Sequence, residues 1–209
     1  MQHIIKRLQI LKLQANITVA FDIGAYRGDF TRALKTVWTD CKVWQFEADD
    51  RQKEFLSNPF IGLLGDVPGK VIDFYTLPDN QVTTGSSIFK ENSQYYLTPV
   101  VLQKIMTTID EAAKFNEYSG DWKNSGLVKI DTQGSELLIL KGAKKFIETN
   151  KPRFFLLECS IIEHNKNGPK IHEIFQYMDS IGYQMKDIFD VLHSTAGLLL
   201  QTDILFERK

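Results

Sequence analysis

The sequence predicts an α/β fold in which a mainly parallel sheet carries helices on both faces. Short apolar runs alternate with longer amphipathic segments, which is the pattern of strands joined by crossover helices. The 209 residues are 43% hydrophobic and 24% charged, which is enough apolar material for one sizeable core. We therefore expect a single domain over residues 1–209.

The first expected element is an N-terminal helix within residues 1–16, because Ile4, Ile5, Leu8 and Leu11 recur at helical spacing. Lysine, arginine and glutamine side chains interrupt the apolar pattern, so the segment is neither a signal peptide nor a membrane span. We expect one face of this helix to pack on the core. Association of its basic amphipathic surface with a membrane is the alternative.

Strands and helices alternate along the rest of the chain. The expected strands are Thr18 to Ile23, Lys42 to Glu47, Ile61 to Leu64, Leu127 to Asp131, Arg153 to Glu158, Tyr183 to Ile188 and Asp203 to Glu207. The expected helices have apolar residues three and four positions apart, and they are Gly28 to Val37, Asp50 to Leu56, Ser135 to Thr149 and Ile171 to Ile181.

Residues 65–108 interrupt this alternation. Two apolar stretches, VIDFYTL and PVVLQKIMTTID, flank the polar segment NQVTTGSSIFKENSQYY. We expect an insertion that forms two extra strands and a lid loop, because loops of this length inside a domain are usually functional.

Charge and cysteine content exclude several classes of protein. The net charge of -1 and the pI near 6.4 give no electrostatic reason to expect nucleic acid or an anionic membrane as a partner. Cys41 and Cys159 are far apart and lack metal-site spacing, so we expect neither a disulfide framework nor a zinc site. A reducing, cytoplasmic location and a small or neutral substrate fit this composition.

The stretch VAFDIGAYRGDF places an acid and two glycines at the end of the first strand. Ligands of open α/β sheets bind beyond the carboxyl ends of the strands, and glycines there allow close approach of the backbone. The dinucleotide fingerprint G-x-G-x-x-G is not matched, because Asp22 precedes Gly24 and Gly28. A carboxylate suits a cationic ligand such as S-adenosylmethionine, and Glu47 ends the next strand, where an acid receives ribose hydroxyls. The structural alternative is that Asp22 caps the following helix and that Glu47 is a solvated strand end.

A second group of acids ends the fourth and fifth strands. Asp131 and Glu158 lie at the same sheet edge if these strands are neighbours, and such a pair can act as a general base, hold hydroxyls or ligate Mg²⁺. His164 is a further candidate base, with a surface loop histidine as the alternative. For Glu136, the alternative is a first-turn acid favoured by the helix dipole alone.

Several stretches together resemble the FkbM family of S-adenosylmethionine-dependent O-methyltransferases. In chain order they are FDIGAYRGDF, VWQFEADD, GKVIDFY followed by GSSIF, TTIDEA, LVKIDTQGSELLILKGA and KPRFFLLE. The LVKIDTQGSELLILKGA block is the specific part, since the glycine motif alone fits any Rossmann-like methyltransferase. The resemblance implies a seven-stranded Rossmann-like class I methyltransferase fold.

The resemblance also implies roles for individual residues. The cofactor residues are Asp22, Gly24, Tyr26, Gly28, Glu47 and Asp66. The substrate is expected near Asp131, Gly134, Glu136 and Glu158, beneath the loop that carries Ser86 and Ser87. Tyr26 stands where the family often has Asn. Gln133, which we count among the substrate residues, stands where Glu is common, so a carboxylate charge is missing and we expect no metal ion.

The expected reaction is methyl transfer to a hydroxyl, most readily a hydroxyl of a sugar in a glycan or a glycosylated small molecule. We expect Asp131 or Glu158 to orient and deprotonate this acceptor, with His164 in reserve. Thr83, Thr84, Asn92 and the tyrosines 95 and 96 suit a carbohydrate, although a solvated loop explains them equally well. The competing hypotheses are a nicotinamide-dependent oxidoreductase and a non-catalytic module that retains the cofactor fold.

Overall fold

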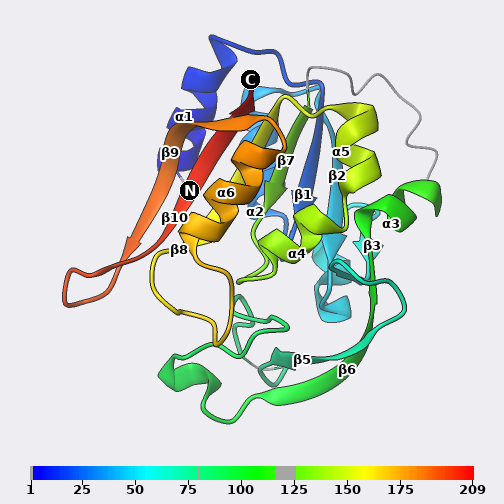
Figure 1. Ribbon diagram of the computed structural model, residues 1–209, viewed down its shortest axis with the longest axis vertical. Coiled ribbons are helices and arrows are strands. Elements are labelled where there is room, and N and C mark those ends of the chain that lie inside the picture. The colour runs from blue at the N-terminus through cyan, green and yellow to red at the C-terminus, as the bar shows by residue number, and fades with distance from the viewer. Residues whose placement is uncertain (1, 80, 116–125) are drawn as a thin grey trace.

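The computed structural model describes residues 2–79, 81–115 and 126–209 of the chain. A seven-stranded sheet forms its centre, with the strand order β3-β2-β1-β7-β8-β10-β9 (Figure 1). These strands are β1 (Val19–Ile23), β2 (Lys42–Glu47), β3 (Phe60–Ile61), β7 (Gly126–Ile130), β8 (Phe154–Ser160), β9 (Tyr183–His193) and β10 (Leu199–Arg208). Only β10 runs antiparallel to its neighbours β8 and β9, which confirms the mainly parallel sheet.

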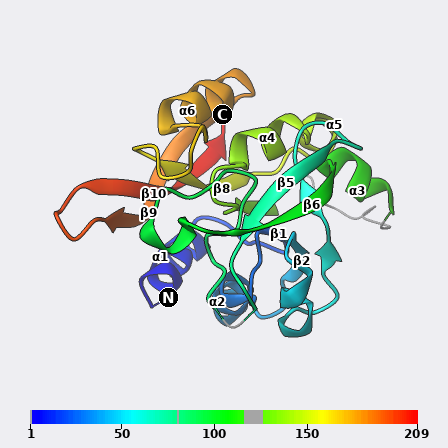
Figure 2. The ribbon, with the colours of Figure 1, turned by 90° about the horizontal axis from the view of Figure 1, so that it is seen from below.

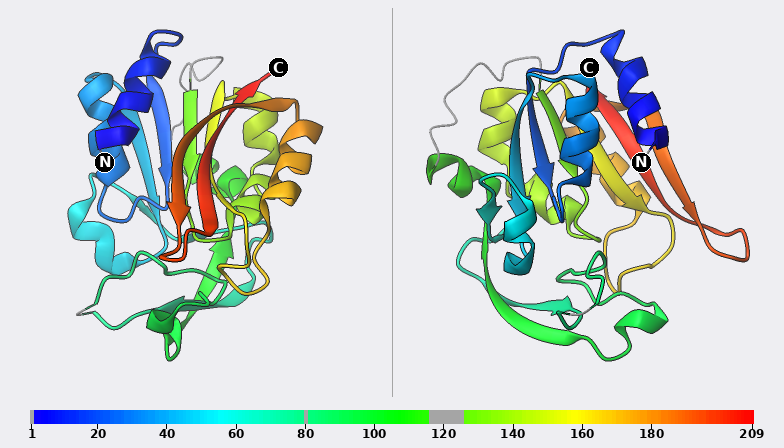
Figure 3. Two further views of the ribbon diagram at one scale, coloured as in Figure 1. Left: turned by 90° about the vertical axis from the view of Figure 1, so that its left-hand side faces the viewer. Right: turned by 180° about the vertical axis from the view of Figure 1, so that it is seen from behind.

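Helices cover both faces of this sheet (Figure 3). The helices α1 (Gln2–Lys12) and α2 (Asp29–Val37) pack on one face, where Ala20, Leu127 and Leu156 lie. The other face carries α3 (Ile109–Phe115), α4 (Glu136–Lys141), α5 (Lys144–Asn150) and α6 (Ile171–Ser180). Because successive strand residues point to opposite faces, Phe21 and Ile23 join this second core, and the acid between them, Asp22, faces α2.

The N-terminal helix α1 is present, and two of its basic residues, His3 and Arg7, contact β9. His3 lies 2.9 Å from Asp190, and Arg7 lies 3.5 Å from Asp187. These contacts tie α1 to the edge of the sheet. In the described part of the chain, no helix combines the length and the apolar character that a membrane crossing requires.

The insertion forms a small sheet of its own, with β4 (Leu63–Leu64), β6 (Val100–Thr107) and β5 (Val71–Thr76) in that order. Seen from below, β5 and β6 cross the carboxyl edge of the main sheet (Figure 2). The expected strand Ile61 to Leu64 is wrong in one respect. Its first half pairs with β2 and its second half pairs with β6, with Gly62 between them.

Two expected helices also differ from the structure. Ser135 to Thr149 is divided into α4 and α5 at Gly142, where an added Cβ would lie 1.9 Å from the carbonyl oxygen of Gly65. Asp110 restarts the helix, since its carboxylate accepts the backbone N–H groups of Lys145 and Phe146. The segment Asp50 to Leu56 forms a 3-10 helix, η1 (Asp50–Phe55), and a second one, η2 (Gln94–Tyr96), lies in the insertion.

Candidate functional site

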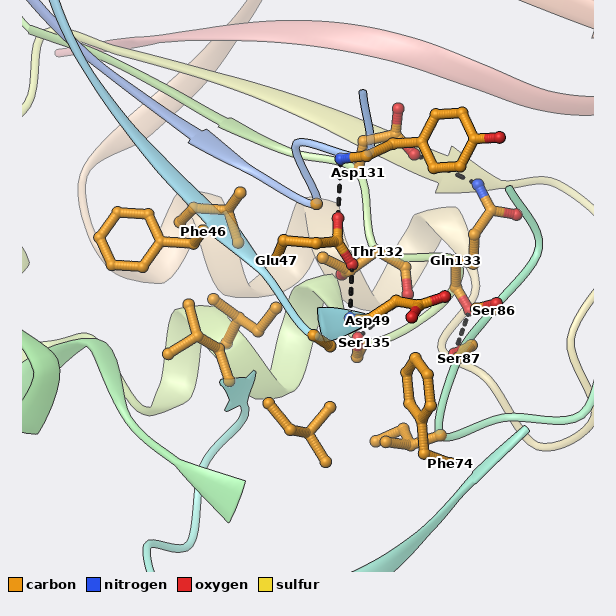
Figure 4. A pocket seen from close by; sticks show the side chains of 18 of the residues that line it. Phe46, Glu47, Asp49, Phe74, Ser86, Ser87, Asp131, Thr132, Gln133 and Ser135 are labelled. Atoms are coloured by element: carbon orange, nitrogen blue, oxygen red, sulfur yellow. Dashed lines mark hydrogen bonds between the residues drawn. The ribbon is translucent and has the colours of Figure 1, made fainter. Parts of the chain in front are cut away.

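Two pockets adjoin each other at the carboxyl edge of the main sheet. Glu47 lines the first pocket, and Glu158 and Asp203 line the second. The first pocket lies between the ends of β1, β2 and β7 and the inserted segment (Figure 4). Its apolar side consists of Phe46, Leu63, Leu64, Phe74, Ile88 and Ile139. Its polar side includes Glu47, Asp49, Thr84, Ser86, Asp131 and Gln133. A ligand held here meets an apolar surface at one end and hydrogen-bonding groups at the other.

The turn after β1 brings the backbone close to the end of β7. Gly24 has a φ of +75°, and a Cβ at this position would lie 1.9 Å from the carbonyl oxygen of Asp131. The N–H groups of Gly24 and Ala25 both donate to the carbonyl of Phe46 at 3.0 Å. Only glycine fits this position, because the turn demands both the left-handed conformation and the space of a missing side chain.

Glu47 is tied to two turns of the backbone. Its Oε2 accepts the N–H of Tyr26 at 2.7 Å, and its Oε1 accepts the N–H of Asp49 at 2.8 Å. Burial raises the pKa of this carboxyl, and the two backbone hydrogen bonds oppose that rise. Each oxygen retains a further lone pair, so the side chain can still accept hydrogen bonds from a ligand in the pocket.

The inserted segment is fastened over the first pocket by Arg51. Its guanidinium donates to Asp49 at 2.6 and 2.7 Å, to Thr76 Oγ1 at 2.6 Å and to the carbonyl of Leu77 at 2.9 Å. Asp49 also accepts the N–H of Arg51 and caps η1, as expected for an acid at a helix start. Ser87 Oγ donates to the carbonyl of Gln133 at 2.7 Å, so the loop is held from both sides.

Asp131, Gln133 and Glu158 come together at the border between the two pockets. The Gln133 amide donates to Glu158 Oε2 at 2.8 Å and to Asp131 Oδ1 at 3.2 Å. Lys129 Nζ donates to Asp131 Oδ2 at 3.0 Å. Burial raises the pKa of Glu158 well above its usual range, and the neighbouring Asp131 adds to the rise. An amide between two carboxylates bridges them, whereas a glutamate there would add a third negative charge.

A model of the methyltransferase FkbM domain matches residues 22–185 of the chain. The chain belongs to the FkbM methyltransferase family. Its cofactor is S-adenosylmethionine, and the nicotinamide-dependent alternative is therefore set aside. The first pocket fits this cofactor, because Glu47 keeps free lone pairs beside a glycine cradle and an apolar wall.

Solved structures of methyltransferases resemble this FkbM-family chain in fold. A methyltransferase FkbM from Methylobacillus flagellatus KT has a TM-score of 0.52 at 18% identity and covers 92% of this chain. This chain spans only 44% of that protein. A precorrin-6y C5,15-methyltransferase from Geobacter metallireducens GS-15 has a TM-score of 0.47 at 9% identity, with 98% of this chain and 87% of that one covered. A search of curated proteins found no match.

Other predicted site residues of this FkbM-family chain lie apart from the pockets. Asp22 is completely buried behind the glycine turn, where it accepts the hydroxyl of Thr31 at 2.7 Å and lies 3.8 Å from Lys129. Asp66 follows β4 and lines neither pocket, and Gly28 caps the start of α2 with a φ of +76°. His164 also lines neither pocket, and its Nε2 lies 3.8 Å from Glu91.

The predicted substrate residues have two kinds of surroundings. Ser86 and Ser87 line the first pocket. Glu136 is buried, where it accepts the N–H groups of Thr132 at 2.8 Å and Gly134 at 3.2 Å. It thereby fixes the turn that carries Gln133, and burial raises the pKa of Glu136 to about 7.

Two charged residues of the site, Lys129 and Asp203, were not predicted from the sequence. Lys129 is buried, and Asp131 and Asp22 raise the pKa of this lysine although burial alone would lower it. Asp203 lies directly opposite Glu158 in the antiparallel pair of β10 and β8. Burial raises the pKa of Asp203 to about 7, and Asp131 adds to the rise. A charged side chain in the interior of an apolar strand is the signal that marks both positions.

Proposed function

We propose that this chain transfers the methyl group of S-adenosylmethionine to a hydroxyl of a sugar, in a glycan or a glycosylated small molecule. One observation carries the proposal: Asp131 and Gln133 line both pockets and therefore lie where a cofactor and an acceptor meet. When bound, the cofactor supplies an electrophilic methyl group attached to a sulfonium. Transfer of this methyl group leaves the sulfur as a neutral thioether.

The residues of the first pocket would hold the cofactor. Glu47 accepts hydrogen bonds from the ribose hydroxyls, and the apolar side formed by Leu63, Leu64 and Ile88 covers the adenine. The turn at Gly24 and Tyr26 receives the amino-acid end, and Asp22 supports this turn from behind. Gly28 starts the helix beyond the turn.

Asp131 is the proposed general base. Its carboxylate borders both pockets and receives the proton of the acceptor hydroxyl as the oxygen attacks the methyl carbon. Lys129 and Gln133 hold the two oxygens of this carboxylate and so orient it. Glu158 holds the acceptor from the other side, and the Ser86 loop covers it. Both cysteines are buried free thiols, which fits a cytoplasmic location.

Calorimetry with S-adenosylmethionine and S-adenosylhomocysteine tests the cofactor site. We expect Glu47→Gln to weaken both ligands at least tenfold, whereas Glu54→Gln, an exposed carboxylate on η1, leaves both affinities unchanged. A melting curve without ligand separates a lost contact from a disturbed turn.

Transfer of a labelled methyl group to a panel of sugars then tests the reaction. We expect Asp131→Asn to lower the turnover number at least a hundredfold with little change in cofactor affinity. Cofactor binding without transfer to any hydroxyl compound would instead favour the non-catalytic module.

A further inference from the structure

The second pocket lies on the side of the main sheet that α1 and α2 cover. It has a volume of about 220 Å³ and is built from α1, α2, β7, β8, β9 and β10. Five of its residues also line the first pocket, namely Gly24, Tyr26, Thr84, Asp131 and Gln133. A molecule in the second pocket therefore lies next to the cofactor.

One side of the second pocket concentrates negative charge. Four carboxylates line the pocket together with one cation, Lys129: they are Asp29, which is paired with Arg32, and Asp131, Glu158 and Asp203. Lys129 is already engaged by Asp131 at 3.0 Å, and Asp22 lies 3.8 Å away. Within the described part of the chain, the carboxylate of Asp203 makes no hydrogen bond or salt bridge, although the charge of Lys129 acts on it.

This arrangement costs stability. Like charges directly opposite each other on paired strands are destabilising, and Asp203 is placed opposite Glu158. Such costs are typical of sites where side chains await a ligand.

The second pocket also has an apolar lining. Ile4 of α1, Phe30 of α2, Leu156 of β8 and Phe189 of β9 line it. The contacts of His3 and Arg7 with Asp190 and Asp187 of β9 hold α1 in place beside the pocket. Carboxylates facing an aromatic and aliphatic surface suit a ring with hydroxyls on its edge and C–H groups on its face.

We propose that the second pocket binds a neutral sugar ring as the methyl acceptor, with Asp203 and Glu158 receiving its hydroxyls and Ile4 of α1 closing its apolar side. This inference rests on the proposed function and adds the place and the charge of the acceptor. An acidic sugar is excluded, because its carboxylate would meet four side-chain carboxylates and one engaged ammonium.

Binding of methyl hexopyranosides to the complex with S-adenosylhomocysteine tests this assignment. Saturation-transfer NMR would be recorded with the methyl glucoside, galactoside and mannoside as neutral probes and with methyl glucuronide as the acidic probe. We expect transfer to at least one neutral probe and none to the glucuronide.

Two matched pairs of variants locate the probe. Ile4→Trp fills the second pocket, whereas Ile5→Trp adds the same ring at a half-buried neighbour that does not line it. Asp203→Asn removes a carboxylate from the pocket, whereas Asp40→Asn removes an exposed one from the turn before β2, which lines neither pocket. We expect Ile4→Trp and Asp203→Asn to lower the signal at least fivefold and the two controls to preserve it.

Several outcomes would overturn the inference. They are an unchanged signal in Ile4→Trp, equal binding of the glucuronide, or no binding of any neutral probe while S-adenosylhomocysteine still binds. Calorimetry with S-adenosylhomocysteine is run on every variant, so that a failure of the acceptor site is distinguished from a failure of the cofactor site. Loss of that binding in the unsubstituted protein would overturn the proposed function and this inference together.

Discussion

The two pockets share a border but are built in opposite ways. In the first pocket, the acid Glu47 is matched by two backbone N–H groups, both from turns close to it in the fold. In the second pocket, Asp131 after β7, Glu158 of β8 and Asp203 of β10 surround one lysine, and the described residues give the Asp203 carboxylate no hydrogen bond or salt bridge. The first pocket is thus preorganised by geometry, and the second holds electrostatic strain that a ligand can relieve.

The largest expected effect on stability comes from replacing Gly24, in the turn beside the first pocket, by alanine. The new Cβ would meet the carbonyl oxygen of Asp131 at 1.9 Å in a backbone conformation with a φ of +75°. We expect a loss of about 3 kcal/mol or more in the free energy of unfolding, measured by urea denaturation.

Gly69→Ala is the matched control for the Gly24 substitution. Gly69 has a φ of +80° but nothing within 4 Å of an added Cβ, so only the backbone term remains, about 1 kcal/mol. Equal losses in the two variants would show that the close approach to β7 does not constrain the turn.

Lys129→Met tests the charge balance of the second pocket. Removing Lys129, the one cation among the described residues that line the second pocket, leaves Asp22 and Asp131 without this counter-charge, which costs about 3 kcal/mol at pH 8. A carboxyl whose pKa is raised on folding destabilises the protein when it is ionised, so the loss should shrink toward pH 5. Lys35→Met, an exposed position on α2, provides the control. A loss that stays constant with pH would contradict the charge argument.

The difference between the two pockets also explains which site residues could be predicted from the sequence. Glu47 and the glycine turn are local features, because each follows a strand whose end is visible in the apolar pattern. Asp22 lies opposite Lys129 in the pairing of β1 and β7, and that register joins segments more than a hundred residues apart. A single strand therefore could not reveal that this acid faces a buried lysine.

The rest of the second pocket could not be predicted from the sequence, because it depends on the order of the strands in the sheet. Asp203 reaches Glu158 only because β10 inserts antiparallel between β8 and β9. Tertiary contact also overrides local pattern at Gly142, where close packing against Gly65 divides a continuous helical periodicity. The order and type of the elements could be predicted locally, whereas partners across the sheet could not.

Gln133→Glu tests how charge at the border between the two pockets affects stability. The substitution removes the amide that donates to Asp131 and Glu158 and inserts a third carboxylate between them. We expect a loss of about 2 kcal/mol at pH 8 and a smaller one at pH 5, measured by urea denaturation. Gln184→Glu, on the exposed part of β9, should change stability little. An equal loss at both pH values would point to packing as the cause.

The smallest expected effect is a gain in stability, in the variant Asp203→Asn. Burial raises the pKa of Asp203 to about 7, so the ionised carboxyl destabilises the folded protein above that pH, and the penalty fades as the pH falls toward 4. The charged groups that set this pKa are Asp131, Lys129, Asp190, Glu136 and Glu158. Asp203→Asn should therefore raise the free energy of unfolding by about 1 kcal/mol at pH 8 and leave it unchanged near pH 4.

The same Asp203→Asn variant should lose acceptor binding, so stability and function would move in opposite directions. Asp40→Asn, at an exposed carboxylate that lines neither pocket, should show neither effect. If Asp203→Asn destabilised the protein at pH 8, this carboxylate would have to stabilise the resting fold. The second pocket would then be held together by its charges, as the first is by its backbone hydrogen bonds.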